Sequence, residues 1–198
     1  MYKMINGVFF DYGGVLIPSA FSTINNNYPN INKERMKSLF YEDRLLVGDK
    51  GTLEQLLNNE YNDIKMSPNE VISFLYNCNK FDEVWFIARK LKEDNLTVGI
   101  ISDCIAELGD VMRQDTEFTS LFYPILLSPE IKLSKKSKKI FDKASERVNV
   151  KSDNLLMIDD NSNNLIAAKE AGWHVILYKN PILLRKDLSR YGILKNGS

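Results

Sequence analysis

The chain has 198 residues, a length that suits one domain with a sizeable core, perhaps carrying an inserted subdomain. Its 26 basic and 26 acidic residues cancel, so the overall charge favours neither nucleic acid nor a membrane surface as a partner. Two cysteines without CxxC spacing, no secretion signal and no apolar run near the roughly 18 residues of a membrane helix lead us to expect a cytoplasmic protein.

Short, continuous apolar runs predict the strands of a sheet that is covered on both faces. Continuous rather than alternating apolar residues are typical of parallel strands buried between helices. The predicted strands cover residues 5–10, 96–101, 123–127, 154–158 and 173–178.

Between these runs the spacing of apolar residues becomes helical. It predicts helices over residues 82–94, 136–149 and 162–171. An alternation of strand and helix is typical of an α/β fold, so we expect a three-layer, doubly wound parallel sheet.

The segment from 18 to 80 interrupts this alternation. Ser67 and Glu70 form the pattern of a capping box at the start of one of its helices. The predicted helices of this segment cover about 33–46, 52–63 and 68–77. We therefore expect a core made of residues 1–17 and 81–198, with a small all-helical cap of residues 18–80 inserted after the first strand.

Polar residues follow three of the predicted strands. Asp11 follows the first, Ser102 and Asp103 the second, and Asp159 and Asp160 the fourth. A single aspartate after a strand is most often a helix cap or a turn former. In a doubly wound sheet, however, ligands bind outside the carboxyl ends of the strands, so three such clusters indicate one shared site.

The acidic residues of this site suit a metal ion. Carboxylate oxygens are the ligands that Mg²⁺ prefers, usually together with water and phosphate. We expect Mg²⁺ to be held by Asp11, Asp159 and Asp160, with the backbone of Gly13 close to the ion.

The remaining residues of the site suit a phosphate group. Ser102 and Asp103 are candidate substrate contacts, and the backbone N–H groups of the Gly13–Gly14 turn can cradle phosphate oxygens. Lys135, on a loop before a predicted helix, supplies a cation on the other side of the phosphate. We expect the neighbouring lysines to belong to a solvated helix start; they are Lys136, Lys138 and Lys139.

Taken together, these segments resemble the haloacid dehalogenase-like hydrolases that carry a helical cap, over nearly the whole chain. FFDYGGVL is similar to the family's first motif, IISD to the second, SPEIKLSKKSKKIF to the third and MIDDNSNNLIAAKEAG to the fourth. The resemblance implies that Asp11 is a nucleophile, that Ser102 and Lys135 bind phosphate, and that Asp159 and Asp160 bind the metal.

Three positions depart from the family pattern. Gly13 stands where most family phosphatases have a second aspartate, which protonates the leaving group. The branch with glycine there includes enzymes resembling glucose-1-phosphate phosphatase, and the loss favours leaving groups that depart without a proton, such as a sugar 1-phosphate or an acyl phosphate. Asp103 replaces a usual asparagine and is a candidate substitute acid or base, and Lys136 replaces a usual proline.

The sequence thus predicts a Mg²⁺-dependent phosphatase that hydrolyses a small phosphorylated molecule, a sugar phosphate or similar, through an aspartyl-phosphate on Asp11. One alternative is a non-catalytic protein of the same fold that binds a phosphorylated ligand or a partner. Another is a haloacid dehalogenase, whose halide leaves without a proton. No nucleic acid or membrane partner is expected, and the oligomeric state stays open.

Overall fold

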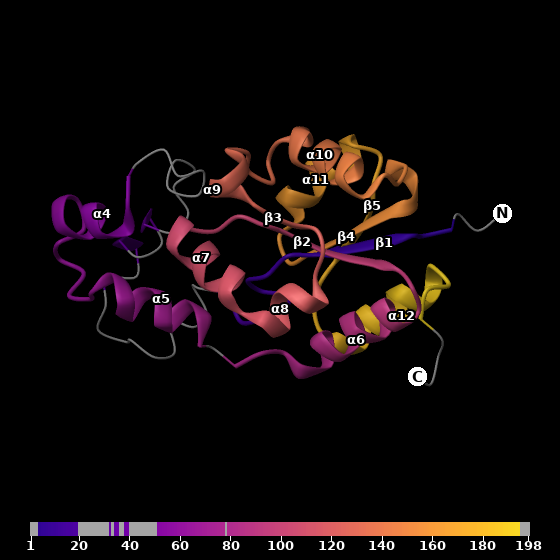
Figure 1. Ribbon diagram of the computed structural model, residues 1–198, viewed down its shortest axis with the longest axis horizontal. Coiled ribbons are helices and arrows are strands. Elements are labelled where there is room, and N and C mark those ends of the chain that lie inside the picture. Colours follow the sequence, from indigo (N-terminus) through magenta and orange to yellow (C-terminus); the bar gives the residue numbers. More distant parts are fainter. Residues whose placement is uncertain are drawn as a thin grey trace.

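A single parallel sheet of five strands forms the centre of the computed structural model, which describes residues 4–19, 32, 34–35, 38–39, 51–77 and 79–194. The strand order is β3-β2-β1-β4-β5, so β1 is the central strand (Figure 1). Each strand lies within or overlaps one of the predicted runs, which confirms the expected fold class. The strands are β1 (Gly7–Phe10), β2 (Thr97–Ser102), β3 (Ile125–Leu127), β4 (Leu155–Asp159) and β5 (His174–Leu177).

The register of the sheet aligns the carboxyl ends of its three middle strands. Phe10, the last residue of β1, pairs with Ile100 of β2 on one side and with Ile158 of β4 on the other. The backbone N–H of Asp11 then donates to the carbonyl oxygen of Ile158 at 2.9 Å. The residues that follow β1, β2 and β4 therefore meet at one edge of the sheet.

Helices cover both faces of this sheet. In Figure 1, α10 and α11 lie on one side and α6 and α12 on the other. The three helices predicted for the core are confirmed as α6, α10 and α11. Four more helices of the core were not predicted; they are α7, α8, α9 and α12. The helices of the core are α6 (Asp82–Glu93), α7 (Ala106–Gln114), α8 (Thr116–Leu121), α9 (Ser128–Ile131), α10 (Lys138–Val148), α11 (Ser162–Glu170) and α12 (Pro181–Arg190).

The central strand is buried along its whole length, which explains its continuous apolar sequence. Val8 and Phe10 join the core cluster that contains α6 and α12 residues, and Phe9 joins the cluster under α10 and α11. The Phe9 ring packs edge-on against Trp173 with their centroids 4.9 Å apart. Successive side chains of β1 therefore hold the two helical layers together.

Two helices of the inserted segment, α4 (Leu53–Asn59) and α5 (Pro68–Tyr76), lie beyond the carboxyl ends of the strands (Figure 1). We call this pair the insert. The predicted capping box at the start of α5 is present, with the Ser67 hydroxyl accepting the N–H of Glu70. Residues 34–35 and 38–39 are helical, and the rest of the predicted helix over 33–46 lies outside the described residues.

Hydrogen bonds fasten the insert to α7. The backbone N–H of Leu53, at the start of α4, donates to Oε1 of Glu107 at 2.7 Å. The hydroxyl of Tyr76, at the end of α5, donates to the carboxylate of Asp115, which directly follows α7. The insert is thus attached to the core through the helix that follows β2.

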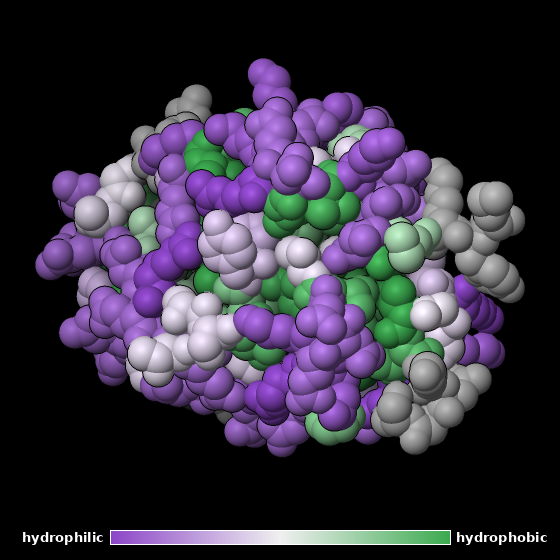
Figure 2. Space-filling model, turned by 45° about the vertical axis from the view of Figure 1, so that its right-hand side comes forward, coloured by the Kyte–Doolittle hydropathy of each residue, from purple (hydrophilic) through white to green (hydrophobic). Residues whose placement is uncertain are grey.

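The face drawn in Figure 2 is hydrophilic over most of its area, with hydrophobic residues gathered in a central band. Within the described ranges, no helix combines the length and the apolar character that crossing a bilayer requires.

Candidate active site

The structure brings the predicted site residues together at the carboxyl edge of the sheet. Six of the eight line one cavity of about 220 Å³. The other two are neighbours of lining residues: Asp159 contacts Lys135, and Gly14 lies against Asp160. The six that line the cavity are Asp11, Gly13, Ser102, Asp103, Lys135 and Asp160.

Lys135 is the cationic centre of the site. Its side chain is 2% exposed, and its Nζ lies 2.5 Å from Oδ2 of Asp11 and 2.7 Å from Oδ2 of Asp159. Burial alone would lower the pKa of Lys135, but the charges of the two aspartates outweigh it and raise the pKa. The ammonium group therefore stays charged and joins the ends of β1 and β4.

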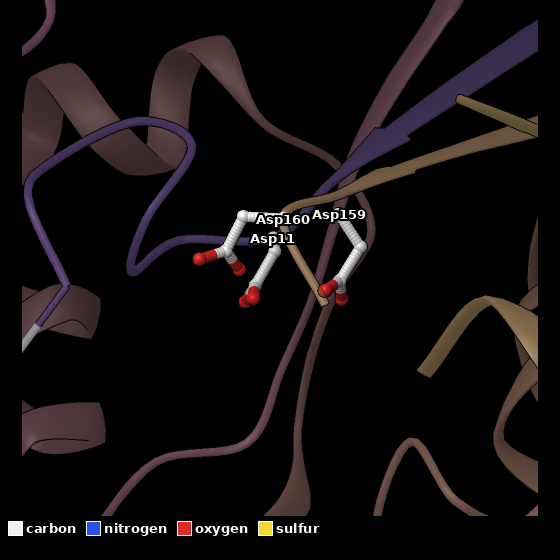
Figure 3. Close-up of side chains that lie close together, drawn as sticks. All are labelled: Asp11, Asp159 and Asp160. Atoms are coloured by element: carbon white, nitrogen blue, oxygen red, sulfur yellow. The ribbon is translucent and has the colours of Figure 1, made fainter. Parts of the chain in front are cut away.

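Asp11, Asp159 and Asp160 form an acidic cluster beside this lysine. Figure 3 shows their carboxylates side by side, and one oxygen from each lies within 4.8 Å of the others. Burial raises the pKa of Asp11 to about 8, against the lowering effect of Lys135 and with a further rise from the charge of Asp159. Burial, and then the charge of Asp159, also raises the pKa of Asp160.

Burial contributes most to these pKa shifts, and the crowding of negative charge at the cluster adds to them. A divalent cation would relieve the crowding, and three carboxylates are the hard oxygen donors that Mg²⁺ prefers. The acidic cluster formed by Asp11, Asp159 and Asp160 therefore fits a Mg²⁺ site.

Asp159 differs from the other two members of the cluster in its partners. Its Oδ1 accepts the backbone N–H of Asn161 at 2.8 Å and the amide of Asn164 at 3.2 Å. Its Oδ2 accepts Lys135 at 2.7 Å and the same Asn164 amide at 3.2 Å. Protein groups thus donate to both carboxylate oxygens of Asp159, which is fully buried.

Gly13 and Gly14 differ in how strictly the structure requires a glycine at their positions. Gly14 has a φ of +83°, its N–H donates to the carbonyl of Ile17 at 2.7 Å, and a Cβ there would run into the carboxylate of Asp160. A Cβ at Gly13 would meet no atom of the described residues within 4 Å. Only Gly14 is required by the backbone and by the space that Asp160 occupies.

Asp103 holds the loop that carries Lys135. Its Oδ1 accepts the backbone N–H of Lys135 at 3.0 Å, and its side chain also lines the cavity. Burial raises the pKa of Asp103, while the charge and the N–H of Lys135 act in the opposite direction. Asp103 therefore has a positioning contact that the sequence analysis did not foresee.

Lys136 also lines the cavity, although we expected it to belong to a solvated helix start. Lys136 is exposed, so it is solvated as expected and also lies at the mouth of the cavity. Lys138 is exposed as expected and pairs with Asp142 at 2.7 Å. The sequence offers no signal that Lys136 lines the cavity, because a run of lysines does not reveal which of them lies beside a cavity.

The rest of the cavity has a mixed lining, in which the insert and the start of α7 supply apolar residues while Tyr12, Ser19, Asn161 and Asn164 carry polar groups. Leu75 comes from α5, while Ile105 and Leu108 come from the N-cap and first turns of α7. The sequence analysis missed these residues because it did not predict α7. Cys104 lines the cavity too, but burial raises the pKa of its thiol well above its usual range, so it is no thiolate nucleophile.

Comparison with known proteins agrees with this architecture. A curated relative, the pyrophosphatase PpaX of Bacillus cereus strain G9842, is 22% identical and aligns over 85% of this chain and 80% of its own. A haloacid dehalogenase family enzyme of Bacteroides thetaiotaomicron, solved with magnesium and inorganic phosphate, has a TM-score of 0.65 at 19% identity, covering 89% of this chain and 95% of that one. The L-2-haloacid dehalogenase of Xanthobacter autotrophicus has a TM-score of 0.63 at 16% identity, covering 94% and 83%.

At such low identity the solved structures establish the fold alone. The family model for haloacid dehalogenase-like hydrolases matches residues 16–178, which is most of the chain. The match begins after Asp11, so the role of that residue depends on the geometry described above. By the extent of this match, the chain belongs to the haloacid dehalogenase-like hydrolases.

Proposed function

We propose that the protein is a Mg²⁺-dependent phosphatase that acts on a small phosphorylated molecule through an aspartyl-phosphate intermediate on Asp11. The observation that carries the proposal is the contact of Lys135 with both Asp11 and Asp159 at the bottom of a cavity. A buried cation beside a carboxylate, with a metal-type acidic cluster, suits attack on a dianionic phosphate. Magnesium and phosphate in the Bacteroides relative support the same chemistry.

The reaction has two steps in this proposal. A carboxylate oxygen of Asp11 attacks phosphorus, and the bond between phosphorus and the leaving oxygen breaks with its electron pair going to the leaving group. Water then attacks the aspartyl-phosphate, the bond from phosphorus to Asp11 breaks, and the proton of the water goes to the released phosphate. Ser102 and Lys135 orient the phosphate oxygens in both steps, helped by the backbone of Gly13 and Gly14.

Mg²⁺, when bound, neutralises phosphate charge so that an anionic nucleophile can approach. Asp11, Asp159 and Asp160 would hold the ion, with the backbone of Gly13 beside them. Asp159 completes the acidic cluster and keeps Lys135 and Asn164 in place.

We also propose that residues 18–80 act as a cap over a core of residues 1–17 and 81–198. The position of α4 and α5 beyond the strand ends supports this division. Gly13 supports membership of the branch that has glycine at this position, and the missing acid favours substrates whose leaving group departs without a proton. Sugar 1-phosphates, as in the glucose-1-phosphate phosphatase-like enzymes, and acyl phosphates both meet that requirement.

The test is hydrolysis of an aryl phosphate by the purified protein, with and without Mg²⁺. We expect Mg²⁺-dependent turnover that Asp11→Asn abolishes. Asp142→Asn is the matched control, because Asp142 is an exposed aspartate whose described partner is the surface residue Lys138. Equal rates for the Asp11→Asn protein and the unaltered one would end the proposal.

Two other outcomes have distinct meanings. Release of chloride from a haloacid that is insensitive to EDTA would favour the dehalogenase alternative. A phosphate ligand that raises the melting temperature while no phosphate ester turns over would favour a non-catalytic binding protein of the same fold.

A further inference from the structure

We propose that the substrate is the acyl phosphate of a small hydrophobic carboxylic acid, whose hydrocarbon chain lies against Leu75, Ile105 and Leu108. This inference rests on the proposed phosphatase function and names its substrate class. It follows from the apolar residues that line the same cavity as the acidic cluster, and from the cation that this cavity has while position 13 carries no acid.

The chain itself leads from the phosphate contacts to an apolar surface. Ser102 ends β2, and Ile105 follows within the same short connection as the N-cap of α7. Ile105 and Leu108 both line the cavity from the start of this helix. Leu75 of α5, which packs against α7, also lines the cavity. We call Leu75, Ile105 and Leu108 the apolar wall of the cavity.

The apolar wall does not suit a sugar. The side chains of the wall offer no hydrogen bond, and a hydroxyl buried against them would lose its partners in water. The lining also holds the polar side chains of Tyr12, Ser19 and Asn161. The Asn164 amide donates to Asp159, Asp103 accepts the N–H of Lys135, and Asn161 accepts the N–H of Asn163. The apolar wall itself thus favours hydrocarbon over a polyol.

The cavity has a cation at Lys136 and no acid at position 13. Gly13 offers no proton, whereas Lys136 lines the same cavity and its charge acts on Asp103. A positive charge stabilises a group that departs as an anion, and a carboxylate is such a group. In the first step, the bond between phosphorus and the acyl oxygen breaks, the electron pair goes to the carboxylate, and no proton is transferred.

The size of the cavity limits the length of the chain. Its volume of about 220 Å³ lies below the roughly 300–1,000 Å³ of sites for drug-sized ligands. A phosphate and a short hydrocarbon chain are therefore the expected occupants.

The experiment compares acetyl phosphate with butyryl phosphate, whose leaving groups are carboxylates of similar basicity that differ by two methylenes. Each methylene buried on the apolar wall is worth about fourfold, so we expect kcat/KM to favour butyryl phosphate by about tenfold or more. Leu108→Asn should bring this ratio towards one. The control Ile182→Asn, on an exposed residue of α12, should leave the ratio as it is.

A ratio of one or less in an active, Asp11-dependent enzyme would overturn this inference and leave the phosphatase proposal standing. So would a higher kcat/KM for glucose 1-phosphate than for butyryl phosphate. Absence of any Asp11-dependent turnover would instead overturn the phosphatase proposal. In that case the apolar wall is tested by melting temperature, where butylphosphonate should stabilise the protein more than methylphosphonate does, and equal shifts would refute the inference.

Discussion

Replacing each of the two adjacent glycines after Asp11 by alanine should have opposite effects. Gly14→Ala places a Cβ on a residue with a φ of +83°, which costs about 1–2 kcal/mol in this left-handed conformation. Gly13→Ala adds a Cβ in open space and should stabilise the protein by about 0.4–1 kcal/mol through the unfolded chain. The free energies of unfolding of the two variants should therefore differ by roughly 1.5–3 kcal/mol.

The same pair separates the two positions in metal binding. A Cβ at Gly14 would displace the carboxylate of Asp160 from the acidic cluster. Loss of such support typically weakens a metal site by about 10–100-fold, so Gly14→Ala should bind Mg²⁺ that much more weakly, while Gly13→Ala should not.

Urea unfolding in EDTA measures the first difference and calorimetric titration with Mg²⁺ the second. Equal stability and equal Mg²⁺ affinity of the two variants would refute the conclusion that the structure requires a glycine at position 14 and not at position 13.

Three further predictions use the same site. Asp159→Asn should lower the free energy of unfolding by about 3–5 kcal/mol, because it breaks a buried ion pair with Lys135. Asp160→Asn should instead weaken Mg²⁺ binding and leave the free energy of unfolding nearly unchanged. Equal effects of the two variants in urea unfolding would contradict this prediction. In EDTA the melting temperature should fall as pH rises from about 4 to about 8, because the pKa of Asp11 is raised from 3.8 to about 8 on folding and this contribution to stability is lost as the group ionises. Asp11→Asn should remove most of that dependence, and an unchanged profile would show that other groups cause it. Gly13→Asp should raise turnover of an alkyl phosphate relative to an aryl phosphate, towards the typical 10²–10⁴-fold effect of a general acid, and an unchanged ratio would argue against a missing acid at this position.

The sequence was sufficient to predict the sheet and the residues at its carboxyl edge. Strands such as β1 are continuous apolar runs because both of their faces are covered, and that pattern needs no knowledge of neighbours. Asp11, Ser102 and Asp159 could be brought together in advance because parallel strands that align in register end at the same edge.

The parts that the sequence did not reveal depend on packing between distant segments. α7 begins without a side-chain cap, so the sequence carries no local signal for its start. Which of its residues face inward depends on the packing of α5 against it, and the sequence alone does not show that packing. The contact of Asp103 with the backbone of Lys135 joins two loops that are far apart in the chain. Lys136 and Lys138 are both exposed, and only Lys136 lines the cavity. The requirement for a glycine at Gly14 but not at Gly13 could likewise not be predicted, because it depends on where Asp160 lies.

The hydrogen bonds from the insert to Glu107 and Asp115 have a consequence for how this protein can vary. Because α7 is fastened at Leu53 and Tyr76 to a segment inserted after β1, two stretches that are distant in the sequence form one structural unit. That unit supplies Leu75 and Leu108 to the lining of the cavity, so residues of α5 and α7 should change together when selectivity changes. Exchange of the insert between related enzymes should accordingly transfer selectivity only when α7 is exchanged with it.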